Sequence, residues 1–370
     1  MITLNNFQRQ WEDTRVDVLE AVETVGSAGW YILGGEVDAF EKDLATLWKL
    51  RHSIGVASGL DAIEISLKAL GCKPGDRVLT TPLSAFATTL AIVKLGAIPV
   101  FPDCDECGLI DLEQCREILK ARPEIRFFVP VHLYGHSLDL TALRSIRDES
   151  GPRIVEDCAQ SILATYRDTA AGSIGQMAAT SFYPTKNLGA MGDGGAILTG
   201  DDDLAARARC LRDYGQSGKY QHTEIGYNSR LDELQAALLR RVHLPRLGRW
   251  TERRREVAAR YSTGIRHNGI RLMGSPRDSN SCWHLFPVRV DAERKQDFLA
   301  WLKSRCVAAG EHYPILIPDQ AAMRTAAHEV IGDCSRARRV ARSQVSLPVH
   351  PYLNEEEIGR VIDACNQWGG

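Results

Sequence analysis

One lysine stands where its neighbours could support chemistry. Lys186 lies between residues 176–183, whose β-branched and aromatic content predicts a buried strand, and a glycine-rich turn before a second predicted strand at 194–199. A lysine on a tight backbone among small residues leaves room for a bulky ligand and suits a Schiff base with an aldehyde cofactor. An exposed lysine in a hairpin loop is the alternative, and this stretch alone does not exclude it.

A second stretch, residues 58–62, has the form of an anion site. A predicted strand at 52–57 passes through Ser58-Gly59 into a helix that stops at Gly71. Free N–H groups and the helix dipole point at such a turn. The GxxxxGK[ST] spacing of a Walker P-loop is absent. A plain tight turn with Ser58 as N-cap explains the stretch equally well.

Two further side chains become candidate cofactor contacts once Lys186 is considered. Asp157 ends a predicted strand, where a carboxylate can pair with a protonated pyridine nitrogen and keep pyridoxal phosphate electron-poor. Phe86 begins a predicted helix and can stack on a flat ring. A helix N-cap and core packing are the plainer interpretations of these two residues.

The elements that position these residues alternate along the chain. Helices are predicted at 7–25 and 37–50, on either side of a glycine loop. Strands follow at 52–57, 77–81, 97–101, 126–131 and 153–157, with helices at 84–95, 111–121 and 139–149. This alternation predicts an α/β fold with a largely parallel sheet covered on both faces. Ser58, Phe86, Asp157 and Gln160 all fall at the carboxyl ends of strands, where such sheets bind ligands.

The C-terminal part no longer shows the regular alternation of strands and helices. Eight arginines lie between Arg240 and Arg260, on a helical stretch that we expect to be interrupted at Pro245. A solvated helix face is favoured for them over a surface that receives an anionic substrate. Strands at 284–290 and 345–349, a helix at 293–304 and a capping box at Asn354 and Glu357 predict a smaller α+β domain. We therefore divide the chain into domains 1–245 and 246–370.

Composition limits the function classes. A chain of 370 residues favours two domains, and a net charge of -2 gives no general reason to expect nucleic acid or an anionic membrane as partner. No apolar run reaches the ~20 residues of a membrane span, and no secretory signal is visible. Ten cysteines then predict reduced thiols and a cytoplasmic protein. Cys104 and Cys107 form a CxxC without a second pair at zinc spacing, so we expect loop cysteines and no metal site.

Four motifs in order carry a family resemblance. They are Ala-Ser-Gly-Leu-Asp-Ala at 57–62, Val-Glu-Asp-Cys-Ala-Gln-Ser at 155–161, Ser-Phe-Tyr-Pro-Thr-Lys-Asn-Leu-Gly at 181–189 with Gly-Asp-Gly-Gly at 192–195, and Gly-Tyr-Asn-Ser-Arg-Leu-Asp at 226–232. Together they resemble the DegT/DnrJ family of pyridoxal-phosphate-dependent sugar aminotransferases. The resemblance implies the fold-type I architecture, a homodimer with shared active sites, and amino transfer from glutamate to a keto sugar on a nucleotide.

The resemblance also implies roles for single residues. Lys186 becomes the Schiff-base lysine and proton shuttle, Asp157 the partner of the pyridine nitrogen, and Asn228 a phosphate contact from the other subunit. The remaining implied cofactor contacts are Gly59, Leu60, Asp61, Phe86, Gln160 and Ser181. The candidate substrate contacts are Tyr31, Tyr183, Lys219, Arg230, His312 and Tyr313.

The version Phe-Tyr-Pro-Thr-Lys-Asn resembles members that aminate position 3 of a dTDP-linked keto-deoxysugar. Residues 83–86 and 104–107 depart from the family pattern, which leaves the keto sugar open, and a keto-cyclitol is the alternative substrate. A sugar dehydratase of this kind would carry histidine in place of Lys186. A short-chain dehydrogenase needs YxxxK and a GxGxxG, whereas this chain has YxxK and no such glycine motif. A non-catalytic relative would not need Lys186, Asp157 and the phosphate turn together.

Overall fold

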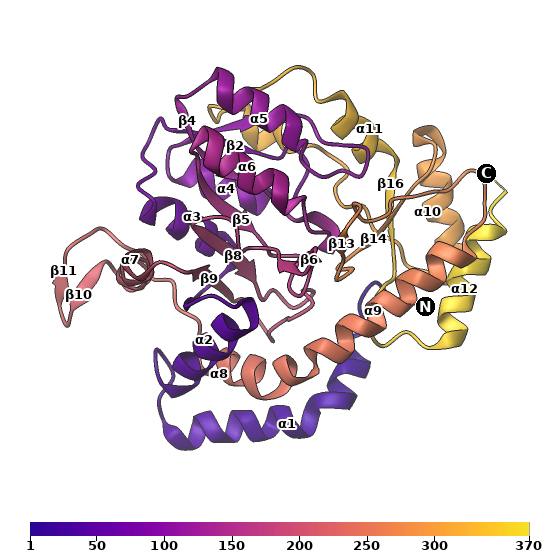
Figure 1. Ribbon diagram of the computed structural model, residues 1–370. Helices are drawn as coiled ribbons and strands as arrows, with labels where there is room; N and C mark the ends of the chain where they lie inside the picture. Colours follow the sequence, from indigo (N-terminus) through magenta and orange to yellow (C-terminus); the bar gives the residue numbers. More distant parts are fainter. Residues whose placement is uncertain (370) are drawn as a thin grey trace.

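A computed structural model describes residues 1–369 and is built around an eight-stranded mixed sheet (Figure 1). In spatial order the strands are β1 (His52–Val56), β9 (Gly195–Thr199), β8 (Met177–Ser181), β5 (Arg153–Asp157), β4 (Ile125–Val129), β2 (Arg77–Thr80), β3 (Ile98–Phe101) and β15 (Glu329–Val330). Every pairing from β8 to β15 is parallel, while β9 runs antiparallel between β1 and β8. The predicted α/β fold with a mainly parallel sheet is confirmed.

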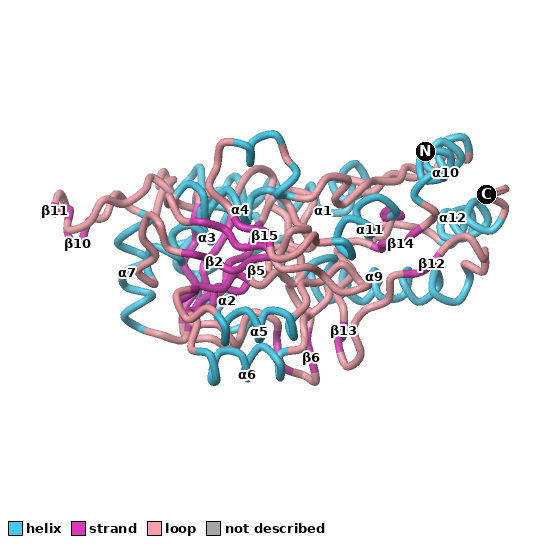
Figure 2. Tube along the Cα trace, turned by 90° about the horizontal axis from the view of Figure 1, so that it is seen from above, coloured by secondary structure: helices cyan, strands magenta, loops and turns pink. Residues whose placement is uncertain are grey.

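Helices cover both faces of this sheet. Figure 2 shows α3 (Gly59–Ala69) and α4 (Phe86–Lys94) on one side of the strands, and α5 (Leu112–Ala121) and α6 (Leu140–Ser150) on the other. In β2, Val78 packs into one hydrophobic cluster and Leu79 into the other. Successive side chains on a strand point to opposite faces, so a sheet buried on both faces requires the continuous apolar runs seen in the sequence.

The strand directions bring the carboxyl ends of several strands to one edge. Because β9 is antiparallel to both β1 and β8, β1 runs in the same direction as β8 and its parallel neighbours. Ser58 follows β1, Phe86 begins the helix after β2, Asp157 ends β5 and the Lys186 loop follows β8. The sheet therefore brings all four to the same edge.

A second core lies around a three-stranded antiparallel sheet. The sheet consists of β12 (Arg271–Leu272), β14 (Phe286–Arg289) and β16 (Gln344–Leu347), and it packs with α9 (Leu244–Gly264), α10 (Lys295–Ser304) and α12 (Glu355–Asn366) (Figure 1). The predicted capping box of the last helix is present, with Asn354 and Glu357 bonded to each other's backbone N–H. The division at residue 245 stays a prediction, and packing crosses it: Ile2 lies in the second core and Val340 in the first.

The expected interruption at Pro245 is wrong. The chain stays helical through α8 (Glu233–Ala237), the π-helical segment η2 (Leu238–His243) and α9. Proline lacks an N–H and normally breaks the ladder of hydrogen bonds inside a helix. Here Pro245 stands in the first turn of α9, directly after the wider π turn, where its missing donor costs little.

Helix α1 (Phe7–Ala28) buries only part of its apolar surface. It packs against α8 and η2 through Thr14, Val18, Ala21 and Val25. The side chains of Phe7, Trp11, Leu19 and Val22 are 40–59% exposed. The apolar surface of α1 is therefore wider than the surface that the chain itself covers.

A buried carboxylate fixes the start of α2 (Gly35–Trp48). Glu233 accepts hydrogen bonds from the backbone N–H groups of Gly34, Glu36 and Val37 at 2.8–2.9 Å and is 3% exposed. We expect Glu233→Ala to lower the free energy of unfolding by about 3 kcal/mol, because three helix-terminal donors lose their charged acceptor. Urea unfolding of the cofactor-free protein measures the change. Glu117→Ala, at an exposed position of α5, is the control, and equal loss in both variants would contradict the capping role.

Residues 1–369 contain neither a membrane-spanning helix nor a metal-binding cluster. No helix there has the length and apolar character to cross a membrane. No group of three or more histidine, cysteine, aspartate or glutamate side chains in that range is placed to hold a metal ion.

Candidate functional site

Lys186 stands on a tight turn between β8 and β9. Its N–H donates to the carbonyl of Tyr183 at 2.8 Å, and Ala190 N–H donates to Phe182 at 2.7 Å. Gly189 is required, because a Cβ there would collide with the backbone carbonyl of Pro184. Burial lowers the pKa of the Lys186 amine to about 8, while the negative charge of Asp157 acts in the opposite direction. The neutral fraction of this amine near pH 7 is therefore larger than that of an exposed lysine.

Asp157 is held in one orientation at the carboxyl end of β5. Its Oδ2 accepts a hydrogen bond from the Thr88 hydroxyl at 2.8 Å, and its Oδ1 accepts from Ala159 N–H at 3.0 Å. The side chain is 5% exposed. Sequence reasoning missed Thr88, although it lies two residues after Phe86, at a strand end that had already been singled out.

Glu156, next to Asp157, points to the other face of the sheet and has a structural role. Its carboxylate is fully buried and bonds to His132 and to the backbone N–H groups of Gly172, Ile174 and Gly175. Burial acts to raise the pKa of Glu156, but the His132 and backbone hydrogen bonds outweigh it and the pKa lies below its usual range. The two adjacent acids therefore face different environments.

Gln160 connects the Asp157 region to a loop from the C-terminal part of the chain. Its Oε1 accepts from Tyr134 N–H at 2.7 Å, and its Nε2 donates to the Tyr313 hydroxyl at 3.2 Å. The Tyr134 hydroxyl in turn donates to the carbonyl of His312 at 2.9 Å. Burial raises the pKa of Tyr313 to about 12, with a contribution from Asp157. The tertiary structure thus brings His312 and Tyr313 beside the residues predicted from the strand ends.

The residue after Lys186 anchors the loop. Asn187 donates through Nδ2 to the carbonyl of Cys282 at 3.0 Å, and its Oδ1 lies 3.3 Å from Nδ1 of His284. Burial lowers the pKa of His284 well below its usual value, and burial lowers that of His312 to about 4, with the Lys186 charge as a further cause for both. Both imidazoles are therefore neutral at pH 7. Nothing in the local sequence pattern pointed to Asn187 or His284.

The start of α3 forms an anion cradle. The Ser58 hydroxyl caps the helix by accepting from Asp61 N–H at 3.1 Å, which confirms the N-cap interpretation. The N–H groups of Gly59 and Leu60 begin the helix, where no intrahelical acceptor precedes them. A Cβ at Gly59 would lie 2.6 Å from Cβ of Ser181, so only glycine fits beside that serine. The cradle and the Ser181 hydroxyl suit a phosphate group.

Asn228 lies at the rim of this cradle. The neighbouring Ser229 is 1% exposed, and its hydroxyl donates to Asp61 Oδ2 at 2.7 Å. Asn228 is exposed and pairs with Asp213 through an isolated bridge. Adjacent residues in extended backbone point in opposite directions, so the Asn228 side chain faces solvent.

Phe86 is half-buried in the first turn of α4. It packs against a small cluster of Phe101, Ile317 and Met323. The contacts that the structure gives it are therefore those of core packing. Phe86 lies two residues before Thr88, the residue of α4 that bonds Asp157.

Four of the six candidate substrate contacts lie apart from the buried residues around Lys186 and Asp157, or at their margin. Lys219 lies at the tip of the hairpin β10 (Gln216–Gly218) and β11 (Gln221–His222), which projects from the body of the molecule in Figures 1 and 2. Arg230 pairs with Asp213 at 2.7 Å. Tyr31 and Tyr183 are 58% and 52% exposed, and Tyr183 belongs to the Lys186 turn. Only His312 and Tyr313 meet the buried cluster.

The arginines of residues 240–260 are bonded to other residues of the same chain. Arg240, Arg241, Arg246, Arg249, Arg253, Arg255 and Arg260 each pair with a carboxylate, and the buried Arg254 donates to the carbonyl of Val349 at 2.7 Å. The favoured interpretation as a structural helix face fits these contacts. The stretch presents no uncommitted arginine to an anionic substrate.

The geometry can be compared with known proteins. The model of the DegT/DnrJ/EryC1/StrS aminotransferase family matches residues 12–366. The dTDP-3-amino-3,4,6-trideoxy-alpha-D-glucose transaminase of Streptomyces venezuelae is 41% identical over 97% of this chain and 93% of its own length. The crystal structure of S. venezuelae DesV in complex with a ketimine intermediate has a TM-score of 0.93 and 39% identity, and covers 99% of this chain and 98% of that one. NtdA from Bacillus subtilis with bound cofactor PMP has a TM-score of 0.86 and 29% identity, over 95% and 81% of the two chains.

Proposed function

The chain belongs to the DegT/DnrJ/EryC1/StrS aminotransferase family, and we propose that it moves an amino group from glutamate to a dTDP-linked 3-keto-deoxysugar. It is a pyridoxal-phosphate-dependent aminotransferase that acts on a keto sugar. The observation that carries the dTDP-sugar substrate is the 41% identity, over nearly the whole chain, to a transaminase named for a dTDP-3-amino sugar.

The described residues fit this cofactor. The α3 cradle with Ser181 accommodates a phosphate, and Asp157 offers a buried, oriented carboxylate. Pyridoxal phosphate, when bound, supplies an electron sink for the carbon that exchanges the amino group. We assign Lys186 as the amine that bonds the cofactor aldehyde and carries a proton at Nζ. Asp157 would hold a proton on the ring nitrogen of the bound cofactor, and Gln160, Tyr313 and the neutral His312 would line the same site.

The lowered pKa of Lys186 predicts how the cofactor-free enzyme captures pyridoxal phosphate with pH. The neutral amine is the nucleophile, so the capture rate should rise about tenfold per pH unit below pH 8 and level off above it. Stopped-flow absorbance measures the rate. At each pH the rate is divided by the rate per neutral amine of a soluble lysine analogue, so that only the cofactor's own titration is removed. Asp157 raises the pKa of Lys186, so Asp157→Asn should move the plateau to lower pH. A plateau that begins only near pH 10 in the wild type would contradict the assignment.

We infer that the active sites are shared between two copies of the chain. Two features support this: the open apolar flank of α1, with Trp11 and Leu19 at 40% and 59% exposure, and the solvent-facing side chain of Asn228 beside the phosphate cradle. A second copy that covers the flank would bury apolar surface that the monomer leaves in water. Asn228 then contacts the phosphate in the partner's site, and the projecting hairpin with Lys219 extends toward the partner.

A hybrid dimer tests this arrangement. Homodimers of Lys186→Ala should be inactive, and those of Asn228→Ala should bind pyridoxal phosphate weakly. Co-expression of the two variants with different tags isolates the mixed dimer, which should contain one doubly damaged site and one intact site. It should therefore recover about half of the wild-type activity per dimer. If Asn228 serves its own chain, both sites carry one lesion and the hybrid stays as inactive as the homodimers.

A substrate panel tests the proposed reaction. Purified enzyme is given glutamate or glutamine with dTDP-linked 3-keto and 4-keto sugars, the free keto sugars and a keto-cyclitol, and the amino product is quantified. We expect the dTDP-3-keto sugar with glutamate to be preferred, because binding energy from the remote nucleotide is lost with free sugars. Equal efficiency on the uncharged keto-cyclitol would overturn the nucleotide-sugar assignment. No product from any of them would favour a non-catalytic relative.

A further inference from the structure

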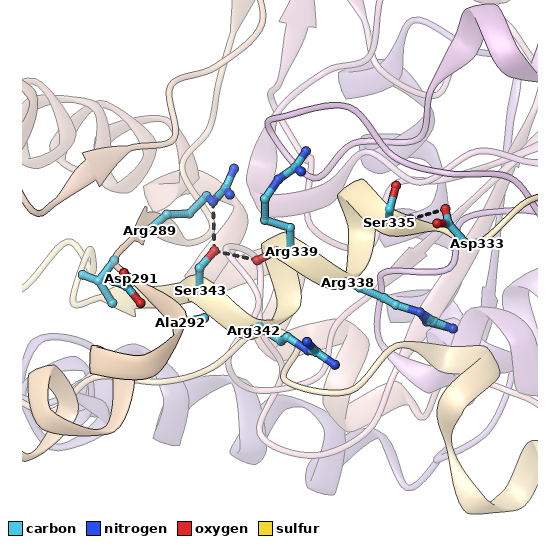
Figure 3. Close-up of a pocket in the computed structure, with 10 residues that line it drawn as sticks. Arg289, Asp291, Ala292, Asp333, Ser335, Arg338, Arg339, Arg342 and Ser343 are labelled. Atoms are coloured by element: carbon cyan, nitrogen blue, oxygen red, sulfur yellow. Dashed lines mark hydrogen bonds between the residues drawn. The ribbon is translucent and has the colours of Figure 1, made fainter.

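A cavity of about 580 Å³ lies against helix α11 (Ser335–Ser343) and the end of β14 (Figure 3). This volume is within the range of small-molecule sites. None of its lining residues belongs to the set assigned above to the cofactor or the keto sugar. The polar residues that line it are Arg289, Asp291, Asp333, Ser335, Arg338, Arg339, Arg342 and Ser343.

Three of the four arginines come from α11, a helix that is buried on one face only. Ala337, Val340 and Ala341 hold α11 against the first hydrophobic core. Arg338 and Arg342 are one turn apart, and Figure 3 shows their side chains extending in the same direction from α11. Arg289, at the end of β14, and Arg339 extend from the other side of the helix in the same view.

Two carboxylates of the chain itself bind to arginines of this cavity, which shows that these arginines can bind oxyanions. The two oxygens of Asp319 accept from the two terminal nitrogens of Arg338 at 2.8 and 2.9 Å. Glu106 bridges the other pair, with Oε1 2.7 Å from Arg339 and Oε2 3.2 Å from Arg289. Planar guanidinium groups in such forked contacts match phosphate as well as carboxylate.

Arg342 is the member without such a partner. It is exposed, and within residues 1–369 it takes part in no recorded hydrogen bond or ion pair. The two aspartates that line the cavity are occupied in backbone caps: Asp291 accepts from Glu293 N–H at 2.9 Å, and Asp333 from Ser335 N–H at 3.0 Å. Neither carboxylate neutralises Arg342.

The neighbouring ion pair is one that a stronger anion can displace. Arg338 and Asp319 are 35% and 42% exposed, and exposed ion pairs of this kind contribute little net free energy. A phosphate monoester carries close to two negative charges and three acceptor oxygens, against one charge and two oxygens on a carboxylate. It therefore competes with Asp319 for Arg338 while also neutralising Arg342.

We propose that this cavity binds a phosphorylated small molecule at a site separate from Lys186. Arg342 and Arg338 contact the phosphate. Asp291 and Asp333 line the cavity and use one carboxylate oxygen each in a backbone cap, so the other oxygen is left to accept from hydroxyl groups on the rest of the ligand. The ligand class is a sugar phosphate or a nucleotide.

Inorganic pyrophosphate is the probe for a first test on the holoenzyme. Isothermal titration calorimetry at low ionic strength compares wild type, Arg342→Gln and, as matched control, Arg360→Gln. Arg360 is exposed on α12 and has no recorded partner within residues 1–369. We expect Arg342→Gln to weaken pyrophosphate binding at this site about tenfold, and Arg360→Gln to leave it unchanged. Equal binding by all three proteins would overturn the proposal.

A second test reads the site directly and is not affected by pyrophosphate bound elsewhere. Wild-type holoenzyme is modified with phenylglyoxal with and without pyrophosphate, and the modification of each arginine is quantified by mass spectrometry. Pyrophosphate should protect Arg342 and leave Arg360 as reactive as before. Citrate, at the same ionic strength, should protect Arg342 less. Protection by citrate equal to that by pyrophosphate, or no protection of Arg342, would contradict a phosphate site.

Discussion

The Lys186→Ala variant should lose turnover by about 10⁴-fold or more, because one amine both bonds the cofactor aldehyde and carries the proton between carbons. The amine is buried behind a turn that Gly189 makes possible, and its pKa is lowered to about 8. No other lysine side chain approaches this cluster among residues 1–369. Steady-state assays with glutamate and the keto sugar measure the loss.

Controls separate loss of chemistry from loss of folding. Lys303→Ala, at an exposed position of α10, should keep wild-type activity. Lys186→Ala should keep the wild-type thermal unfolding profile, because a buried ammonium carries a desolvation cost that alanine does not. A small primary amine added to Lys186→Ala should restore part of the proton transfer. A variant that turns over at a rate near that of wild type would refute the assignment of Lys186.

Asp157→Asn should slow amino transfer about 10³-fold while leaving the cofactor bound. An amide cannot keep the pyridine nitrogen protonated, so the cofactor becomes a poorer electron sink. The amide oxygen can still accept from Ala159 N–H, and the Thr88 hydroxyl can turn to accept from the amide N–H, so both hydrogen bonds are kept. Single-turnover kinetics of the half-reaction with glutamate measure the rate, and absorbance of the released cofactor measures its content.

Variants of Thr88 test how far the orientation of Asp157, apart from its charge, affects the half-reaction. Thr88→Val leaves the charge of Asp157 in place but removes the donor that orients Oδ2, so it should slow the half-reaction about tenfold. Thr88→Ser keeps the hydroxyl and should restore most of the rate. Asp168→Asn, at an exposed position, should have no effect. An Asp157→Asn half-reaction as fast as wild type would reduce Asp157 to a structural cap.

Hydrophobic periodicity and the positions of glycine and proline in the sequence were enough to predict the alternating strands and helices. The alternation of predicted strands with predicted helices predicted a largely parallel sheet covered on both faces. Because the carboxyl ends of parallel strands share an edge, Ser58, Phe86, Asp157 and Gln160 could be grouped from the sequence. The capping signals at Ser58 and Asn354 also held, since a cap depends only on residues three positions apart.

Contacts between segments far apart in the chain were not predictable in this way. His284 and His312 meet the Lys186 loop because the second core folds back on the sheet edge, and local spacing does not encode that meeting. The opposite environments of Glu156 and Asp157 depend on which layer covers each face of β5. The stripe of α1 that is buried depends on where α8 and η2 lie.

The sequence by itself determined the sheet, its edge and the lysine–carboxylate pair, because these follow from local backbone preference and strand direction. The tertiary structure alone decided the rest of the wall around Lys186. It also placed seven of the eight arginines of residues 240–260 in ion pairs and Arg254 against a backbone carbonyl. It left Arg342 without an ion pair within residues 1–369. Whether a charged side chain is available to a ligand depends on which opposite charge packs beside it, and that is a property of the folded arrangement.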